Sequence, residues 1–314
     1  MALPTINDVQ MVEPVLTNMM TAFRQGTERF IASRVFPVVN VATDSGTFYK
    51  FTKKYWYLDA LQRRAPGDPF ARLDFGVESD TYKTEQWAAD YAIPDEVRAN
   101  ASAPLDLERA AVDFLGQKSM LRKEIQFAAD FMKTGVWGTD NTSATDWDDF
   151  TNGDPIADLI NAAGVVSSAT GYQPNTLIVG EVVHRALMNH PDVIDRLKYV
   201  MAANQNNIRQ SLMGLLGIEN YLVAGAIYSN TNEAAAFSAS PVIDDDALLL
   251  YVNPSAGPTG LSAGKTFVWE PGGGEGMLYR YRDNSRHSDV IQHKEQWDQK
   301  VIAPELGYFF SDIV

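Results

Sequence analysis

A long, mostly extended and aromatic-rich segment between Arg24 and Asn100 constrains the fold of this chain more than any other feature. Its centre, residues 63–69, reads Arg-Arg-Ala-Pro-Gly-Asp-Pro and predicts a basic turn. Alternating side chains at 36–52, and a second extended run at 73–93, predict the two arms of a long hairpin with a broad loop. Because a two-stranded ribbon cannot bury both faces within its own subunit, we expect this segment to bind another molecule.

The charge of this segment differs from that of the rest of the chain. Residues 50–72 carry a net charge of +4, from six basic and two acidic residues, whereas the whole chain carries −14. A basic arm on an acidic body suits binding to further copies of the same chain. An acidic surface on an adjacent subunit, with residues 140–158 as one candidate, is its expected partner. The residues that we expect in intersubunit contacts are Lys53, Lys54, Arg63, Arg64, Pro66, Gly67 and Arg72.

Composition limits the class of protein. A length of 314 residues with 45% hydrophobic and 21% charged residues predicts two domains, or one domain with large insertions, around a sizeable core. The acidic balance argues against a nucleic-acid-binding surface. The absence of cysteine excludes disulfides and thiolate metal sites and suits a reducing compartment. The N-terminus lacks the pattern of a signal peptide and no apolar run is long enough to span a membrane, so we expect a soluble protein made in the cytosol.

Helical patterns flank the extended segment. Helical pieces within 12–30, interrupted by Pro14 and Gly26, predict an N-terminal arm that lies on another surface. Downstream, a stripe of spacing four and three predicts a helix of about 28 residues that ends near Gly135. We expect this helix to pack along a sheet, with a coiled coil as the alternative. The stripe residues are Leu107, Ala111, Phe114, Lys118, Leu121, Ile125, Ala128 and Met132, of which only Lys118 is charged.

The segment from Ile156 to about Trp269 predicts a compact α/β unit. The expected strands are 174–180, 221–227, 247–252 and 265–269, and the expected helices are 181–189 and 204–216. The tail after Met277 is again extended.

Motifs that carry chemistry are weak in this chain. Residues 260–266 resemble a phosphate-binding loop, but three residues rather than four separate the glycines and a strand-like sequence follows, so a plain turn is favoured. The glycine run at 272–276 predicts a loop. Three consecutive aspartates at 244–246 lack the spacing of a calcium loop, which favours a solvated turn over a cation site.

No other side chains indicate a catalytic, cofactor or metal site. The four histidines, His184, His190, His287 and His293, lack the spacing of paired metal ligands on one helix. Tyr55, Trp56 and Tyr57 beside two lysines are compatible with stacking on single-stranded nucleic acid, but the net charge favours packing against polypeptide.

Four groups of residues, taken in their order along the chain, resemble parts of a known protein family. The first is 63–67; the second is 93–100 with 104–108 and 122–124; the third is 175–180 with 190–196; the fourth is 303–308. In that order they resemble the extended loop, the start of the spine helix, the start of the axial domain and the ending of the major capsid proteins of tailed bacteriophages. Those proteins have the Hong Kong ninety-seven coat fold.

The resemblance implies an α+β, Hong Kong ninety-seven-like phage capsid fold with an N-terminal arm, an extended β-hairpin loop, a peripheral domain with a long spine helix, and an axial α/β domain. The implied division is arm 1–35, extended loop 36–93, peripheral domain with spine helix 94–155, axial domain 156–275, return strands of the peripheral domain 276–303, and C-terminal strand 304–314.

The resemblance also implies a function. It implies a major capsid protein that self-assembles through hexamers and pentamers into an icosahedral shell, in the host bacterial cytoplasm, around the double-stranded DNA genome of a tailed phage. The implied partners are a portal, a decoration protein and DNA held without sequence-specific binding, with no membrane and no cofactor. Alternatives are the shell of an encapsulin-type nanocompartment and an α/β enzyme.

Two departures from the family pattern modify these expectations. The chain starts at the arm, whereas many relatives carry a scaffolding segment before it, so we expect a separately encoded scaffolding protein. Some relatives also crosslink a loop lysine to a neighbouring subunit. Lys50, Lys53, Lys54 and Lys83 lie at suitable positions, but no motif selects one of them, so covalent crosslinking is not expected.

Overall fold

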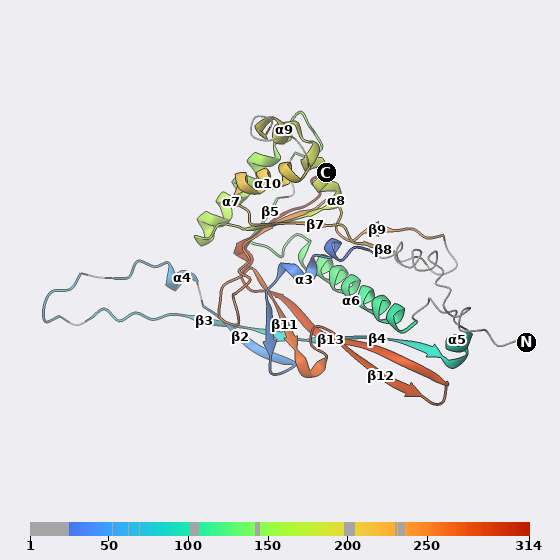
Figure 1. Ribbon diagram of the computed structural model, residues 1–314. Coiled ribbons are helices and arrows are strands. Elements are labelled where there is room, and N and C mark those ends of the chain that lie inside the picture. The colour runs from blue at the N-terminus through green and yellow to red at the C-terminus, as the bar shows by residue number, and fades with distance from the viewer. Residues whose placement is uncertain are drawn as a thin grey trace, which may run out of the picture.

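The computed structural model describes residues 25–51, 53–61, 63–68, 70–100, 107–141, 145–197, 205–229, 231 and 236–314. Figure 1 shows three parts: a helix-rich upper part around one sheet, a lower part in which a long helix lies along a second sheet, and a thin loop that projects far to one side.

The upper sheet has the strand order β5-β14-β10-β6-β7. Its strands are β5 (Thr139–Asn141), β6 (Thr176–Gly180), β7 (Asn220–Ala224), β10 (Ala247–Leu250) and β14 (Gly307–Phe310). The helices of this part are α7 (Pro155–Thr170), α8 (Glu181–Asn189), α9 (Pro191–Leu197) and α10 (Gln205–Leu216). Asp154 caps the start of α7 by accepting the amide of Ala157, and Gly171, with φ 74°, ends that helix.

The lower sheet is organised around β13 (Ser288–Val301), a strand of 14 residues. β13 pairs antiparallel with β11 (Gly264–Trp269), β12 (Met277–Asp283) and β4 (Glu85–Pro94), and β1 (Val38–Val41) extends the sheet beyond β11. Helix α6 (Leu107–Phe131) lies along this sheet, and α5 (Asp95–Asn100) follows β4 at the far end (Figure 1).

The projecting loop starts with a short hairpin. β2 (Ser45–Phe51) and β3 (Val77–Lys83) pair antiparallel, and α4 (Lys53–Trp56) follows β2. The remaining short elements are η1 (Thr27–Arg29), α3 (Ala32–Val35), β8 (Ile227–Tyr228), β9 (Ser240–Pro241), η2 (Glu270–Gly272) and η3 (Pro304–Leu306).

The upper sheet separates two hydrophobic cores, because successive strand residues point to opposite faces. Leu177 and Leu249 pack under the helices, while Ile178 and Leu248 face the lower part. The core on that lower face also receives Phe127 and Phe131 from the last turns of α6. The C-terminal end of the long helix is therefore anchored beneath the upper sheet, and its N-terminal end extends away from it.

The strand pairing corrects the expected long hairpin. Residues 85–94 are extended as predicted, but they pair with β13, so the hairpin is limited to β2 and β3. Residues 264–269 form the predicted strand, but in the lower sheet rather than in the α/β unit. The reason in both cases is pairing between residues far apart in sequence, which a local pattern does not contain.

The long helix is confirmed, but the predicted buried stripe was wrong in part. Phe114 and Lys118 are exposed, and Leu115 is buried instead. The arm pattern at 12–24 lies outside the described residues. No helix of the described part is long and apolar enough to cross a membrane.

Candidate functional site

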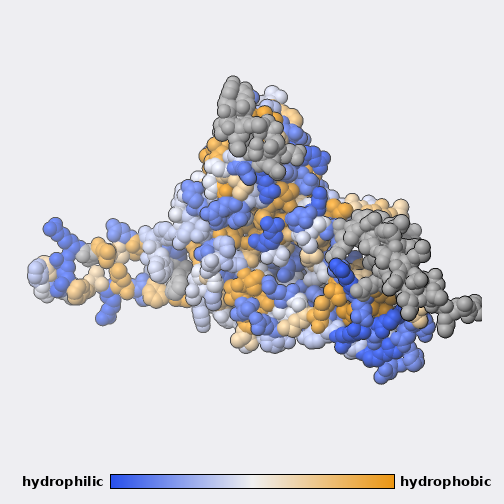
Figure 2. All heavy atoms as spheres, in the orientation of Figure 1, coloured by the Kyte–Doolittle hydropathy of each residue, from blue (hydrophilic) through white to orange (hydrophobic). Residues whose placement is uncertain are grey.

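Apart from Phe237, the most exposed large hydrophobic side chains of the described residues lie on the projecting loop. Leu61 is 87% exposed, Phe70 82% and Trp56 67%. Figure 2 shows hydrophobic residues interleaved with hydrophilic ones along the projection. Exposed apolar sets of this kind are typical of interaction surfaces. We call it the loop surface; it consists of Tyr49, Tyr55, Trp56, Tyr57, Leu58, Leu61, Phe70, Leu73, Phe75 and Val77.

The tip of the loop has a defined structure of its own. Gly67 adopts φ 97°, a conformation that favours glycine, and the Asp68 amide donates to the Ala65 carbonyl at 3.2 Å. The Arg64 guanidinium lies 4.2 Å from the ring centre of Phe70, and its Nε donates to the Asp68 carbonyl. The tip is therefore held together by Arg64, which also restrains Phe70.

The seven residues predicted for intersubunit contacts are all exposed, but they do not form one cluster. Lys53 and Lys54 lie in α4, at the root of the loop, and Arg72 lies on its returning segment. Arg63, Arg64, Pro66 and Gly67 form the tip. Their contact with another subunit stays a prediction. Sequence analysis did not predict the apolar loop surface as a contact site. The only signal for it in the sequence is the number of aromatic residues in this segment.

The root of the loop is attached to the body. The Tyr57 hydroxyl donates to the Thr170 carbonyl at the C-terminal end of α7. Across the hairpin, Lys50 Nζ lies 2.9 Å from Asp80 Oδ2, and this hydrogen bond holds the pKa of Asp80 below its ordinary value. These contacts give the loop a defined direction relative to the body.

The two tip arginines are expected to differ in their effects. Arg64→Glu removes the contacts that close the tip, so it should accelerate amide hydrogen exchange at Asp68, whereas Arg63→Glu should leave that exchange unchanged. Each change reverses a charge, so both should weaken assembly without unfolding the subunit. Mass spectrometry of exchange, with light scattering for assembly, measures both effects. Normal assembly of the Arg63→Glu variant would show that charge pairing does not dock the tip.

The acidic segment proposed as a partner for the loop uses several carboxylates locally. Asp140 accepts the Gly135 amide at 2.6 Å, and Asp158 accepts Trp147 Nε1 at 3.0 Å. Asp149 accepts from the Asn152 side chain, which with nearby amides lowers the pKa of Asp149. Asp140 and Asp149 therefore close turns, and Asp158 holds the Trp147 ring; the docking role of this segment stays a prediction.

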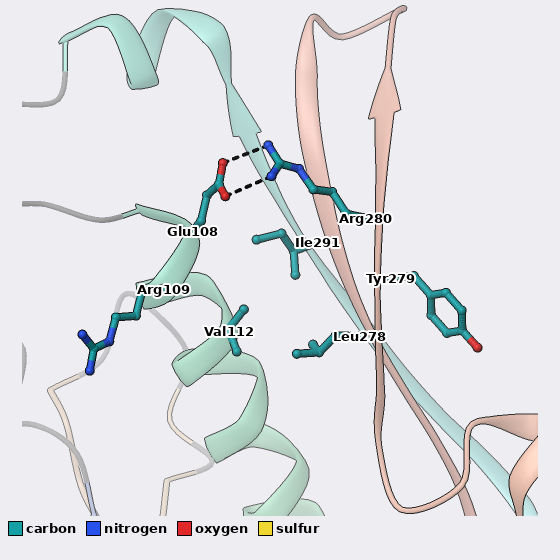
Figure 3. A pocket seen from close by; sticks show the side chains of 7 residues that line it. All are labelled: Glu108, Arg109, Val112, Leu278, Tyr279, Arg280 and Ile291. Atoms are coloured by element: carbon teal, nitrogen blue, oxygen red, sulfur yellow. Dashed lines mark hydrogen bonds and ion pairs between the residues drawn. The ribbon is translucent and has the colours of Figure 1, made fainter.

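A groove of about 440 Å³ lies between the start of α6 and β12 (Figure 3). Val112, Leu278 and Ile291 point into it from the helix and the two strands, while Arg109 and Tyr279 point away. At one end, Arg280 holds Glu108 with two hydrogen bonds of 3.0 and 2.9 Å. The groove thus has an apolar floor and a charged end.

That charged end belongs to a larger ion network at the tip of the lower sheet. Asp289 on β13 lies 2.6 Å from Arg98 and 3.1 Å from Arg280, and it also contacts Arg282, which binds Asp95 on α5. The hydrogen bond from Arg98, followed by that from Arg280, lowers the pKa of Asp289 to about 2. The network joins α5, α6, β12 and β13 at an exposed end of the subunit.

Two glutamates are buried where α6 packs: Glu124 on the helix faces the start of α3, and Glu295 on β13 faces the helix. Glu124 of α6 accepts the amides of Ile31 at 2.9 Å and Ala32 at 2.8 Å, and burial raises its pKa to about 7. Glu295 of β13 accepts from Ser119 at 2.7 Å. Burial opposes its ionisation, yet His293, Ser119 and the charge of Lys123 hold the pKa of Glu295 below its ordinary value. A hydrophobicity pattern predicts that glutamates face solvent, so it does not identify Glu124 and Glu295 as buried.

The other motifs have structural explanations. Lys265 is the second residue of β11, and its Nζ donates to the Pro258 carbonyl at 2.8 Å, which confirms the plain turn before that strand. His184 Nδ1 lies 2.9 Å from the Tyr221 hydroxyl, and burial lowers the pKa of His184. Within the described ranges, no three His, Asp or Glu side chains lie close enough to hold a metal ion.

Comparison with known proteins gives a consistent result. A family model described as "Phage major capsid protein E" matches residues 66–264, more than half of the chain. The "Major capsid protein" of Burkholderia phage BcepMu is 26% identical over 233 residues, which cover 73% of each chain. A solved phage-related protein from Bordetella bronchiseptica RB50 superposes with a TM-score of 0.71 at 24% identity, covering 96% of this chain and 97% of that one.

More distant structures share the fold at lower identity. The solved structure titled Microbacterium phage Oxtober96 superposes with a TM-score of 0.59 at 11% identity, covering 92% of this chain and 93% of that one. With the mixed helices and sheets described above, this confirms the expected α+β, Hong Kong ninety-seven-like fold. The division of the chain into domains stays a prediction.

Proposed function

Because the chain belongs to the phage major capsid protein E family, we propose that its copies bind one another through the loop surface as they assemble into a shell. The chain is the major capsid protein of a phage, its place is the virion capsid, and the capsid consists of many copies of it. One observation carries the proposed role of the loop: large apolar side chains such as Leu61 and Phe70 are left exposed on a projection that its own subunit does not cover.

The proposed assembly is a closed icosahedral shell of hexamers and pentamers, formed in the host bacterial cytoplasm around double-stranded DNA. Permanent interfaces of this kind commonly bury more than about 2,000 Å². A projecting loop that lies across a neighbour supplies such area without a large core interface, and the symmetry of a shell repeats each contact. The seven predicted contact residues, from Lys53 to Arg72, lie on this projection.

Electron microscopy of the purified chain under assembly conditions tests this proposal. The expected result is closed particles with six-fold and five-fold capsomers, and a loop that contacts the adjacent subunit. A stable monomer with an ordered loop under all conditions would contradict it. Aberrant or polydisperse particles from the single chain, made uniform by adding a second phage protein, would support the further proposal of a separate scaffolding protein.

The remaining partners are proposed from the family. A portal at one vertex and a decoration protein on the outside are proposed, and the shell is proposed to confine DNA rather than to bind it specifically. The net charge of −14 supports weak DNA binding, because like charges repel. Tight, steeply salt-dependent binding of free DNA to isolated subunits would contradict that part.

Two alternatives predict different observations. An encapsulin-type shell would enclose an enzyme cargo, and neighbouring genes would lack a portal and a terminase; the match to a phage capsid family disfavours it. An α/β enzyme would need a closed pocket with converging polar groups. The family is one of structural capsid proteins, and the groove between α6 and β12 is instead open, with an apolar floor.

A further inference from the structure

The start of α6 is covered less completely than its end. Ala111 and Leu115 are buried against Ile93 and Ile291 of the lower sheet, which gives a small core. On the β12 side of this core Leu278 stays 51% exposed, and the groove described above opens beside it. The other end of α6, in contrast, is buried beneath the upper sheet. The groove is thus apolar surface of the lower part that the described residues leave uncovered.

The described chain begins next to this helix. Gln117 Nε2 of α6 donates to the Gln25 carbonyl at 3.4 Å. The Gln25 side chain is also held, since its amide nitrogen donates to the Ile227 carbonyl at 2.7 Å and its oxygen accepts the Ile227 amide at 3.0 Å. The 24 residues that precede Gln25 therefore start from a fixed point beside the middle of α6.

These residues are long enough to reach the groove of their own subunit. Gln117 and Glu108 are nine residues apart on α6, which is about 14 Å along its axis. Crossing the helix adds roughly its diameter of about 10 Å. An extended chain covers about 3.3 Å per residue, so about eight residues make this path. The rest of the segment remains to occupy the groove.

The chemistry of the segment fits the groove. Its apolar side chains include Leu3, Ile6, Val9 and Val12, which match a floor of Val112, Leu278 and Ile291. Before Arg24, its only charged side chains are the acidic Asp8 and Glu13. The groove is lined by Glu108 as well as by Arg109 and Arg280, and Arg280 is paired with Glu108 and Asp289, so the fit depends on the apolar side chains.

We propose that the groove between α6 and β12 holds the N-terminal arm of the same subunit, with apolar side chains between Leu3 and Val12 on its floor. The arm adds a third layer to the small core at the start of α6 and braces that end of the helix against β12. The fixed point at Gln25 favours the arm of the same chain over the arm of another copy. The proposal holds for an unassembled subunit as well, so it does not depend on the proposed function.

The absence of cysteine allows a clean crosslinking test. Leu278→Cys places a thiol in the groove, and the adjacent Tyr279→Cys is the matched control, because that side chain points away from it (Figure 3). Each is combined in turn with Leu3→Cys, Ile6→Cys, Val9→Cys or Val12→Cys. Disulfide formation requires Cβ atoms about 3.5–4.5 Å apart, so it reports proximity. The chains carry two different tags and are mixed, and both free subunits and particles are oxidised.

The expected result is that, with at least one arm position, the Leu278→Cys chain forms an intrachain disulfide at least about tenfold faster than the Tyr279→Cys chain. Val112→Cys replaces Leu278→Cys if that variant does not fold. Equal rates at all four arm positions would overturn the proposal. Disulfides found only between differently tagged chains would overturn it as well, because the groove would then hold the arm of another copy.

Discussion

A chain carrying Leu61→Ser is expected to remain folded and to lose shell assembly. Leu61 is 87% exposed in the subunit, so its removal should change the free energy of unfolding by no more than about 0.5 kcal/mol. At an interface, truncation of a central apolar side chain costs about 2 kcal/mol or more. That is roughly a thirtyfold weaker contact, since about 1.4 kcal/mol corresponds to a factor of ten. Because a shell repeats the contact in every copy, the loss should be nearly complete.

Light scattering and electron microscopy measure assembly, and thermal unfolding of free subunits measures folding. Phe237→Ser is the matched control, because Phe237 is 78% exposed but lies outside the loop. We expect Phe70→Ser to assemble as poorly as Leu61→Ser, and also to loosen the tip, since Phe70 lies against Arg64. Shells of normal yield from the Leu61→Ser chain would exclude the loop surface as the main contact.

The local signals in the sequence predicted many elements with close boundaries. The predicted strand 174–180 and helix 181–189 correspond to β6 and α8, because a short β-branched run and an amphipathic period are local properties. Helix α7 was missed, since its sequence is rich in Ala, Gly and Ser and has no strong apolar period. Asp154 as the N-cap and Pro155 as the first helical residue form a start signal that a search for caps would have found.

What the sequence did not predict depends on contacts between distant residues. β4 and β13 are about 200 residues apart, and only their pairing shows that the hairpin is short. The buried face of α6 differs from the predicted stripe at the start of the helix. There Leu115 packs on β13, while Phe114 lies against Tyr91 at the sheet edge. The loop was predicted as a contact site from its charge, but the pairing of Arg64 with Phe70 needs coordinates.

The buried glutamates lead to the second large expected effect, which concerns pH. The pKa of Glu124 in the folded subunit is about 7, raised from 4.5, so the folded state binds its proton more tightly than the unfolded state. Its contribution to stability is therefore complete below pH 4.5 and is lost as the pH rises towards 7. A pKa shift of this size corresponds to a loss of about 3 kcal/mol in the free energy of unfolding. The loss is smaller if water reaches the ionised Glu124 carboxylate.

Glu295 has the opposite dependence. Its pKa in the folded subunit is lowered, so its contribution is present above the ordinary value of 4.5 and is lost as the pH falls. Glu295→Gln removes the charge of a buried carboxylate that accepts from Ser119 and that lies in the field of the buried Lys123. Hydrogen bonds to a charged group contribute about 1.5–3 kcal/mol, so the substitution should cost an amount of this order. The cost should shrink in acid, because the natural glutamate is then protonated as well.

Denaturant unfolding of free subunits between about pH 3 and 8 separates the two side chains, because the contribution of Glu295 changes below pH 4.5 and that of Glu124 changes above it. Glu124→Gln keeps an oxygen that accepts the Ile31 and Ala32 amides but carries no charge, so the decline in stability with rising pH should flatten. The gain at pH 8 should be about 1–2 kcal/mol, because the new amide group lacks a partner and offsets part of the relief. Glu295→Gln should instead destabilise by a constant amount above pH 4.5 and by less below it. The same pH slope in both variants would contradict the opposite pKa shifts of Glu124 and Glu295, because each shift has its own pH range and sign.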